Sequence, residues 1–293
     1  MCDDDYILPN AKVKAYIIGD TLELGTGLGN PAPIRKINAN EYVTPNGITK
    51  QFKKHSKNRS ENLESIKNSI KRLRRLITHN FSGGKNELWV TLTYRENVTD
   101  TKKVYDDFKA FIKKLRRYVG GSDLQYIYVI EPQERGAWHI HLLLKLMSEN
   151  HLYIENEIVS KKWGHGFVNV KRLKEDDNIA AYVSAYLSDI DVTGTSEQFD
   201  DDVEKTASEN KRVKKGARLY LYPRGVRLYR KSKMIEQPPE FRGVKHEVMK
   251  ALSIKNSPLL PKSYYKFDLE MPDGSMRKFE KEFFDIRVDR RWD

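Results

Sequence analysis

The sequence predicts an α+β fold in which strands and helices alternate around one β-hairpin. Two apolar runs, residues 126–130 and 142–144, flank a short turn that contains Pro and Gly, which is the pattern of two strands joined by a turn. Apolar residues at steps of three and four predict amphipathic helices on either side of a strand at residues 87–94. The order is therefore helix, strand, helix, hairpin, helix, strand and helix.

The hairpin carries polar residues where a structural hairpin needs none. Residues 131–141 read Glu-Pro-Gln-Glu-Arg-Gly-Ala-Trp-His-Ile-His. Side chains alternate across a strand, so His139 and His141 share one face, and the turn brings Glu131 back towards His139. Two imidazoles and a carboxylate with open positions suit Mn²⁺ or Mg²⁺ acting as a Lewis acid. Glu134 is the competing carboxylate, and two solvated histidines without a metal are the alternative interpretation.

The composition favours a polyanionic partner. The net charge is +12 and the sequence pI is about 9.4. Residues 51–80 hold nine Lys or Arg against two Glu, so more than half of the net charge is concentrated there. The only cysteine is Cys2, no run approaches 18 apolar residues, and the N-terminus is acidic. We therefore expect a soluble protein in the cytoplasm of a bacterial host cell.

The first elements are a small hairpin and a basic helix. Residues 11–24 predict a hairpin around Gly19 and Asp20, and the glycines of residues 25–30 lack the spacing of a dinucleotide-binding loop. Apolar residues in 62–80 define one helical face, and cations crowd the rest. We expect this basic face to contact DNA phosphates, although a solvated face or a membrane surface fits the same pattern. The cations are Lys67, Lys71, Arg72, Arg74 and Arg75.

The middle of the chain supplies further elements of the sheet and its helices. A strand at 87–94 places Trp89, Thr91 and Thr93 on one face. A helix at 101–118 ends at Gly120-Gly121, a helix at about 154–163 follows the hairpin, and a strand spans 167–173. His165 lies between two glycines and is interpreted as a loop residue rather than a further ligand.

Residues 178–189 predict the second chemical element. Asn178 can cap a helix that carries Tyr182 and Tyr186 four residues apart on one face. Aromatic residues at this spacing often form a core. A tyrosine can also attack a DNA phosphodiester, but its phenolate needs help because a free tyrosine has a pKa near ~10. We expect Tyr182 to attack first, because it lies nearer the positive end of the helix.

Three motifs, taken together and in order, resemble those of rolling-circle replication initiator endonucleases of the His-hydrophobic-His superfamily. They are Thr-Leu-Thr-Tyr at 91–94, the His139/His141 pair preceded by Glu131, Arg135 and Gly136, and the Tyr182/Tyr186 pair. The run at 131–141 is especially similar to initiators of Gram-positive plasmids, phages and integrative elements. The likeness covers about residues 60–190 and again 219–233.

The resemblance implies an antiparallel sheet of ferredoxin-like or RRM-like type with helices on one face. It also implies nicking of one DNA strand at an origin, a 5′-phosphotyrosine link and rejoining of the strand. Thr91, Thr93 and Arg135 are then further expected DNA contacts. Relatives usually carry Lys three residues after each tyrosine, where this chain has Ala185 and Asp189.

The same resemblance implies partners: single-stranded or supercoiled origin DNA, and a host helicase and polymerase. The sequence holds no nucleotide-binding loop of the Gly-x-x-x-x-Gly-Lys-Ser/Thr kind. Two alternatives remain open. One is a non-catalytic nucleic-acid-binding module on the same sheet, and the other is a transposase of the same superfamily.

Four segments are expected. They are an N-terminal extension (1–60), the catalytic core (61–192), an acidic and then basic flexible linker (193–215), and a C-terminal α+β extension (216–293). In the last segment we expect strands within 218–229, a helix at 241–252, and a hairpin of 264–270 with 276–286.

Overall fold

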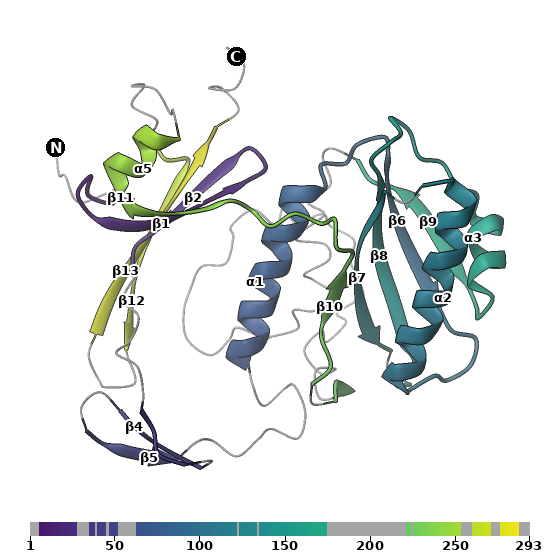
Figure 1. The fold of residues 1–293 in the computed structure, drawn as a ribbon, viewed down its shortest axis with the longest axis horizontal. Helices are drawn as coiled ribbons and strands as arrows, with labels where there is room; N and C mark the ends of the chain where they lie inside the picture. The colour runs from purple at the N-terminus through teal and green to yellow at the C-terminus, as the bar shows by residue number, and fades with distance from the viewer. Residues whose placement is uncertain are drawn as a thin grey trace, which may run out of the picture. The chain divides into compact units, whose positions relative to one another are not determined.

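The structure is a computed structural model. It describes residues 6–27, 35–51 (except 39, 45 and 46), 63–174 (except 122 and 134) and 221–286 (except 224, 253–259 and 271–275). The chain divides into two compact units, Ser56–Glu236 and a unit that joins Met1–His55 to Gln237–Asp293 (Figure 1). The N-terminal and C-terminal segments thus contribute to one unit, whereas the sequence patterns suggest two separate extensions. The expected linker at 193–215 lies outside the described residues.

Ser56–Glu236 is built on a five-stranded antiparallel sheet in the order β10-β7-β8-β6-β9. The expected hairpin is its centre, because β7 and β8 pair along their whole length. The strands are β6 (Glu87–Thr93), β7 (Leu124–Pro132), β8 (Trp138–Leu146), β9 (Val168–Arg172) and β10 (Tyr229–Lys231).

Three helices of this unit follow the apolar patterns in the sequence. They are α1 (Leu63–Asn80), α2 (Thr101–Val119) and α3 (Asn156–Trp163). The side chain of Asp100 caps α2 by accepting a hydrogen bond from the Lys102 N–H at 2.8 Å. Gly120 ends α2 in the left-handed conformation, with φ of 69°. The α+β class with an antiparallel sheet and flanking helices is therefore confirmed.

The helices cover both faces of the sheet, so the expectation of helices on one face is wrong (Figure 1). The Phe108 ring of α2 lies 3.9 Å, centroid to centroid, from the Tyr128 ring on the face of β7 that also carries Ile130. On the opposite face, Lys145 of β8 donates a hydrogen bond to the carbonyl of Asn80, the last residue of α1, at 2.9 Å. The apolar stripe of α1 supplies this second contact, since its buried residues join the same core as the sheet.

The other unit contains a second five-stranded antiparallel sheet, in the order β11-β1-β2-β13-β12. One of its faces packs against α5 through a small core that includes Leu24, Val248 and Phe284. Its elements are β1 (Lys12–Ile18), β2 (Thr21–Gly25), β11 (Glu240–Val244), α5 (Lys245–Ala251), β12 (Ser263–Glu270) and β13 (Met276–Asp285). A three-stranded sheet of β3 (Arg35–Lys36), β4 (Glu41–Val43) and β5 (Thr49–Gln51) was not expected from the sequence.

The predicted hairpins at 11–24 and at 264–286 are confirmed, but the start of the helix predicted at 241–252 is wrong. Residues 240–244 pair with β1 as strand β11, and the helix begins only at Lys245. In the described part of 218–229, a strand begins only at Tyr229. Within the described ranges, no helix is both long and apolar enough to cross a membrane.

Candidate functional site

The pairing register brings the predicted ligands together on one face of the sheet. His139 of β8 lies opposite Glu131 of β7 and opposite Thr93 of β6. His141, two residues further along β8, lies opposite Thr91. The centroids of the two imidazole rings are 6.3 Å apart. The alternation of side chains thus gives the arrangement that the His-Ile-His spacing predicts.

His141 contacts Glu131 directly. Its Nε2 lies 2.9 Å from Oε2 of Glu131, and the histidine side chain is buried. On the other side of the ring, Nδ1 lies 3.5 Å from Oγ1 of Thr91. Trp89 donates its indole N–H to the same hydroxyl oxygen at 3.1 Å, and its ring lies 5.6 Å from that of His141. A chain of contacts therefore runs from Trp89 through Thr91 and His141 to Glu131.

This chain can hold His141 in either tautomer. A neutral imidazole carries one proton, so an Nε2–H that donates to Glu131 leaves Nδ1 to accept from the Thr91 hydroxyl. If Nε2 binds a metal ion instead, Nδ1 carries the proton and can donate to the same hydroxyl, which is both donor and acceptor. Thr91 is thus placed to orient His141 rather than to face DNA, a role that its position in the first motif did not reveal.

The donor set fits a divalent ion at two of the three expected ligands. Two atoms bound at about 2.1 Å and at right angles to each other lie about 3 Å apart. The 2.9 Å between His141 Nε2 and Glu131 Oε2 matches that spacing. His139 shares the face, yet in the described residues no three His, Cys, Asp or Glu side chains gather closely enough to hold an ion. Residue 134, the competing carboxylate, is outside the described ranges.

The turn of the hairpin is fastened to the end of β6. The Gly136 N–H donates to the Gln133 carbonyl at 2.8 Å, and Gly136 has φ of 86°, a left-handed conformation that favours glycine. Arg135 donates from Nη2 to the Tyr94 carbonyl at 3.0 Å and from Nε to Gln133 Oε1 at 3.2 Å. Arg135 is exposed, so it both braces the turn and remains at the surface.

A second brace holds β6 from the side of α3. The Thr93 N–H and hydroxyl both donate to the Phe167 carbonyl at 2.9 Å, and the Trp163 indole N–H donates to the Thr93 carbonyl at 2.8 Å. Gly166 lies so close to the backbone of residues 93–95 that a Cβ there would collide with it. The Thr93 hydroxyl, which we expected to contact DNA, is therefore engaged within the protein.

The segment that follows the third motif returns to the hairpin. Tyr222 donates its hydroxyl to the Ile130 carbonyl at 2.6 Å, and its ring lies 5.2 Å from that of Trp138. The Trp138 indole N–H donates to the Thr99 carbonyl at 2.8 Å. Strand β10 then pairs with β7. Apart from the resemblance of residues 219–233, no sequence pattern indicates this long-range packing.

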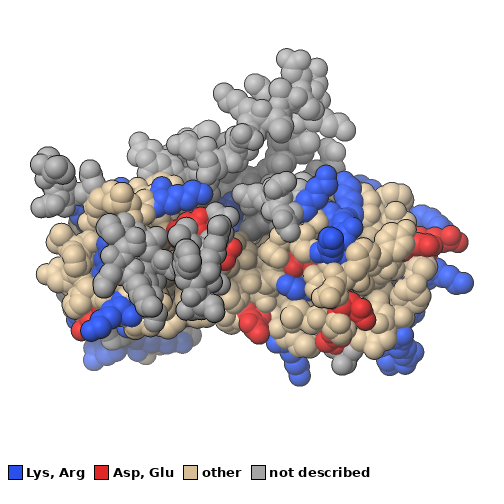
Figure 2. Space-filling view, turned by 90° about the horizontal axis from the view of Figure 1, so that it is seen from above, with Lys and Arg blue, Asp and Glu red and all other residues tan. Residues whose placement is uncertain are grey.

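The basic helix α1 lies on the histidine face. Lys145 shares that face with His139 and His141 by alternation along β8, and it bonds to the end of α1. Of the expected phosphate contacts, Lys71 and Arg72 are exposed, whereas Arg74 and Arg75 are half-buried. The Lys67 side chain is outside the described set. Figure 2 shows basic and acidic side chains on the face that it presents, with the basic ones forming the larger patches.

Tyr182 and Tyr186 lie outside the described residues. Two described tyrosines near the hairpin, Tyr94 and Tyr128, lie on the face opposite to the histidines. Burial raises the pKa of both, and Asp107, which accepts a hydrogen bond from Tyr94 at 3.1 Å, raises the Tyr94 pKa further. Neither phenol can supply a phenolate near neutral pH, so neither is a nucleophile for chemistry at His139 and His141.

Comparison with known proteins identifies this region. Residues 87–191 match a family model of replication-associated proteins, the ORF2 family. The match begins at β6 and includes the whole hairpin and both predicted tyrosines. No curated protein and no solved structure matches the chain.

Proposed function

We propose that this chain, whose residues 87–191 match a replication-associated family of the rolling-circle Rep type, nicks one DNA strand at an origin and later rejoins it. The nucleophile is Tyr182 or Tyr186, and a divalent ion, Mn²⁺ or Mg²⁺, assists the reaction.

One observation supports the proposal most strongly. His141 contacts Glu131 directly on the histidine face of the hairpin, and the 2.9 Å between Nε2 and Oε2 suits two neighbouring ligands of one ion. Such a pair on an otherwise apolar hairpin is costly unless it has a use, because burying polar groups costs free energy. A merely structural pair would not need a second histidine, His139, on the same face.

The residues that would hold the ion are His139, His141 and Glu131. When bound, a divalent ion polarises phosphate oxygens and stabilises the charge that develops on them. The protein's own residues prepare for this role. Thr91 keeps the Nδ1 side of His141 satisfied, and the buried Trp89 ring next to it keeps water from that side.

The nicking step belongs to tyrosine. The phenol oxygen attacks the phosphorus and gives up its proton, the bond from phosphorus to the 3′ oxygen breaks, and that oxygen takes up a proton to become a free 3′ hydroxyl. The phosphate remains on tyrosine as a 5′-phosphotyrosine. Rejoining is the reverse step, and it needs no ATP because the covalent link keeps the free energy of the phosphodiester.

Helix α1 provides an approach for DNA on the same face. Its exposed cations, such as Lys71 and Arg72, can neutralise phosphates of a strand that reaches the histidines. Arg135 at the surface of the turn is a further candidate. In this proposal a host helicase separates the strands and a host polymerase extends the 3′ end.

The experiment is a nicking assay on a labelled single-stranded origin oligonucleotide with Mn²⁺, Mg²⁺ or a chelator. We expect cleavage with either ion and none with the chelator. Cleavage that persists at the full rate in the chelator would rule out the metal, and tight binding without any cleavage would favour the non-catalytic module.

A further inference from the structure

We infer that the second unit carries a separate surface for single-stranded DNA on the hairpin of β12 and β13. The inference goes beyond the proposed function and rests on it only for the choice of DNA. The surface consists of six residues, which we call the aromatic face: Tyr265, Phe267, Arg277, Phe279, Lys281 and Phe283.

The register puts these residues on one side of the sheet. Phe267 lies directly opposite Phe279, and Tyr265 lies opposite Lys281. Arg277 and Phe283 fall on the same side by alternation along β13. The small core with Val248 of α5 lies on the other side, since it contains Leu24 and Phe284. The single helix described in this unit, α5, therefore leaves the aromatic face uncovered.

The rings are held in place and partly exposed. Phe267 and Phe279 have nearly parallel rings, with an angle of 13° and centroids 5.6 Å apart, and Phe267 is 40% exposed. Gly27, with φ of +87°, lies so close to the Phe279 ring that a Cβ would collide with it. Tyr265 and Phe283 meet edge to face at 5.9 Å. A half-exposed pair of fixed rings is a surface on which bases can stack.

The charge on this side fits a polyanion. Lys281 places its ammonium group 6.0 Å from the centroid of the Phe267 ring, and Arg277 is the second cation. The six residues include no carboxylate.

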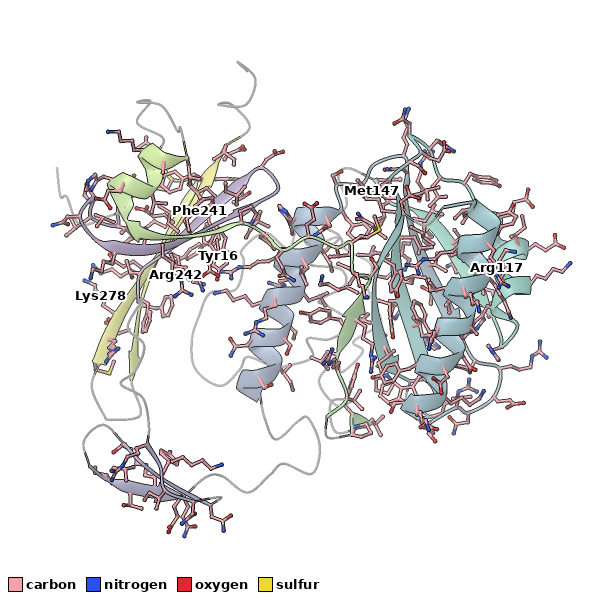
Figure 3. All side chains as sticks on the ribbon, viewed as in Figure 1. Tyr16, Arg117, Met147, Phe241, Arg242 and Lys278 are labelled. Carbon is pink, nitrogen blue, oxygen red and sulfur yellow. The ribbon has the colours of Figure 1, made fainter. Side chains whose placement is uncertain are left out.

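The reverse side of the same hairpin differs in this respect. There Lys266 lies opposite Glu280, and Asp268 lies opposite Lys278, which is labelled in Figure 3. Charges are matched in these cross-strand pairs. On the aromatic face, by contrast, Lys281 lies opposite Tyr265 and Arg277 lies opposite Leu269, so each cation faces an uncharged residue across the hairpin.

Rings that stack on bases and cations that meet phosphates are the two elements of sequence-tolerant binding to single strands. The surface would hold a separated strand on the unit that does not carry the histidines, without reading its sequence.

The test uses the full chain and a labelled (dT)₂₀ that lacks any origin sequence, in a chelator so that no cleavage occurs. We expect Phe267→Ala with Phe279→Ala to weaken binding at least about fivefold, because each stacked base contributes that much or more. Lys281→Gln should lower the log–log slope of affinity against salt by about 0.7. The matched control is Lys250→Gln, at an exposed position of α5 on the other side of the sheet.

Two readouts separate this proposal from the proposed function and from misfolding. Nicking of an origin oligonucleotide at saturating concentration should stay at the wild-type level in Phe267→Ala, and ultraviolet crosslinks to (dT)₂₀ should map to residues 263–285. Binding of the double variant within twofold of the wild type, or crosslinks confined to Ser56–Glu236, would overturn the inference. So would a change in oligomeric state at unchanged DNA affinity, which would assign the face to contacts between copies.

Discussion

Nε2 of His141 and Oε2 of Glu131 lie 2.9 Å apart across the two central strands of the sheet. The pair connects the third position of the His-Ile-His run to a carboxylate ten residues earlier, and the register of the hairpin alone creates it. A slip of one residue would turn His141 to the apolar face. The register of β7 against β8 is therefore a condition of any chemistry at this site.

We predict that His141→Ala and Glu131→Gln each abolish nicking and leave binding of origin DNA within several-fold. Glu131→Gln keeps the size of the side chain but removes the negative charge that a divalent ion requires. His151→Ala is the matched control, since His151 is exposed outside the sheet. Wild-type nicking by the double variant His139→Ala/His141→Ala would contradict the assignment of the site.

Thr91 tests the orientation of His141. We expect Thr91→Val to lower the affinity for Mn²⁺ by about 10- to 100-fold, because it removes the hydroxyl that satisfies Nδ1. Thr91→Ser keeps the hydroxyl and should restore most of that affinity. A titration of nicking rate against Mn²⁺ measures both, and equal curves for the Val and Ser variants would show that the hydroxyl has no such role.

The fold of the hairpin unit could be predicted far into its details, because its patterns are local. The period of two in β8 placed His139 and His141 on one face, and the period of three to four in α1 gave its buried stripe. Residues 240–244 were misread as helix because their strand exists only through pairing with β1, more than two hundred residues earlier. The roles of Thr91 and Arg135 were hidden for the same reason, since their partners come from other strands or loops.

The basic helix gives a prediction about salt. Neutralising two of the α1 cations, as in Lys71→Gln/Arg72→Gln, should flatten the log–log dependence of DNA affinity on salt by about two. Lys109→Gln/Lys113→Gln is the control, because these exposed lysines belong to α2 on the opposite face of the sheet. Equal slopes for both double variants and the wild type would assign α1 to a solvated surface.

Gly166 tests how firmly the end of β6 must be held. We expect Gly166→Ala to destabilise the protein by roughly 1–3 kcal/mol, because the added Cβ meets backbone atoms that cannot turn away. Thermal unfolding measures the effect. Gly25→Ala is a suitable control, since its Cβ would find only ordinary contacts at 3.8 Å. A Gly166→Ala protein as stable as the control would mean that the loop can move without cost.

Tyr94 gives a prediction about pH. Its pKa in the folded protein is raised by burial and by Asp107, above the value of about 10 of an unfolded tyrosine. The folded state thus keeps a proton that the unfolded state loses, so this contribution to stability is fully present below pH 10 and declines as the pH rises above it. Denaturant unfolding at pH 9 and pH 11 should show a larger loss for the wild type than for Tyr94→Phe. Nicking at neutral pH should survive Tyr94→Phe, because this phenol is not the nucleophile.

The covalent step is the centre of the account, and mapping the adduct tests it most directly. The protein is incubated with single-stranded origin DNA and Mn²⁺, digested with protease and nuclease, and analysed by mass spectrometry for a peptide that carries a nucleotide. We predict a 5′-phosphotyrosine on Tyr182, with Tyr186 taking over in Tyr182→Phe and no adduct in the double variant. An adduct on any residue other than these two, or cleavage by the double variant at the wild-type rate, would contradict the account.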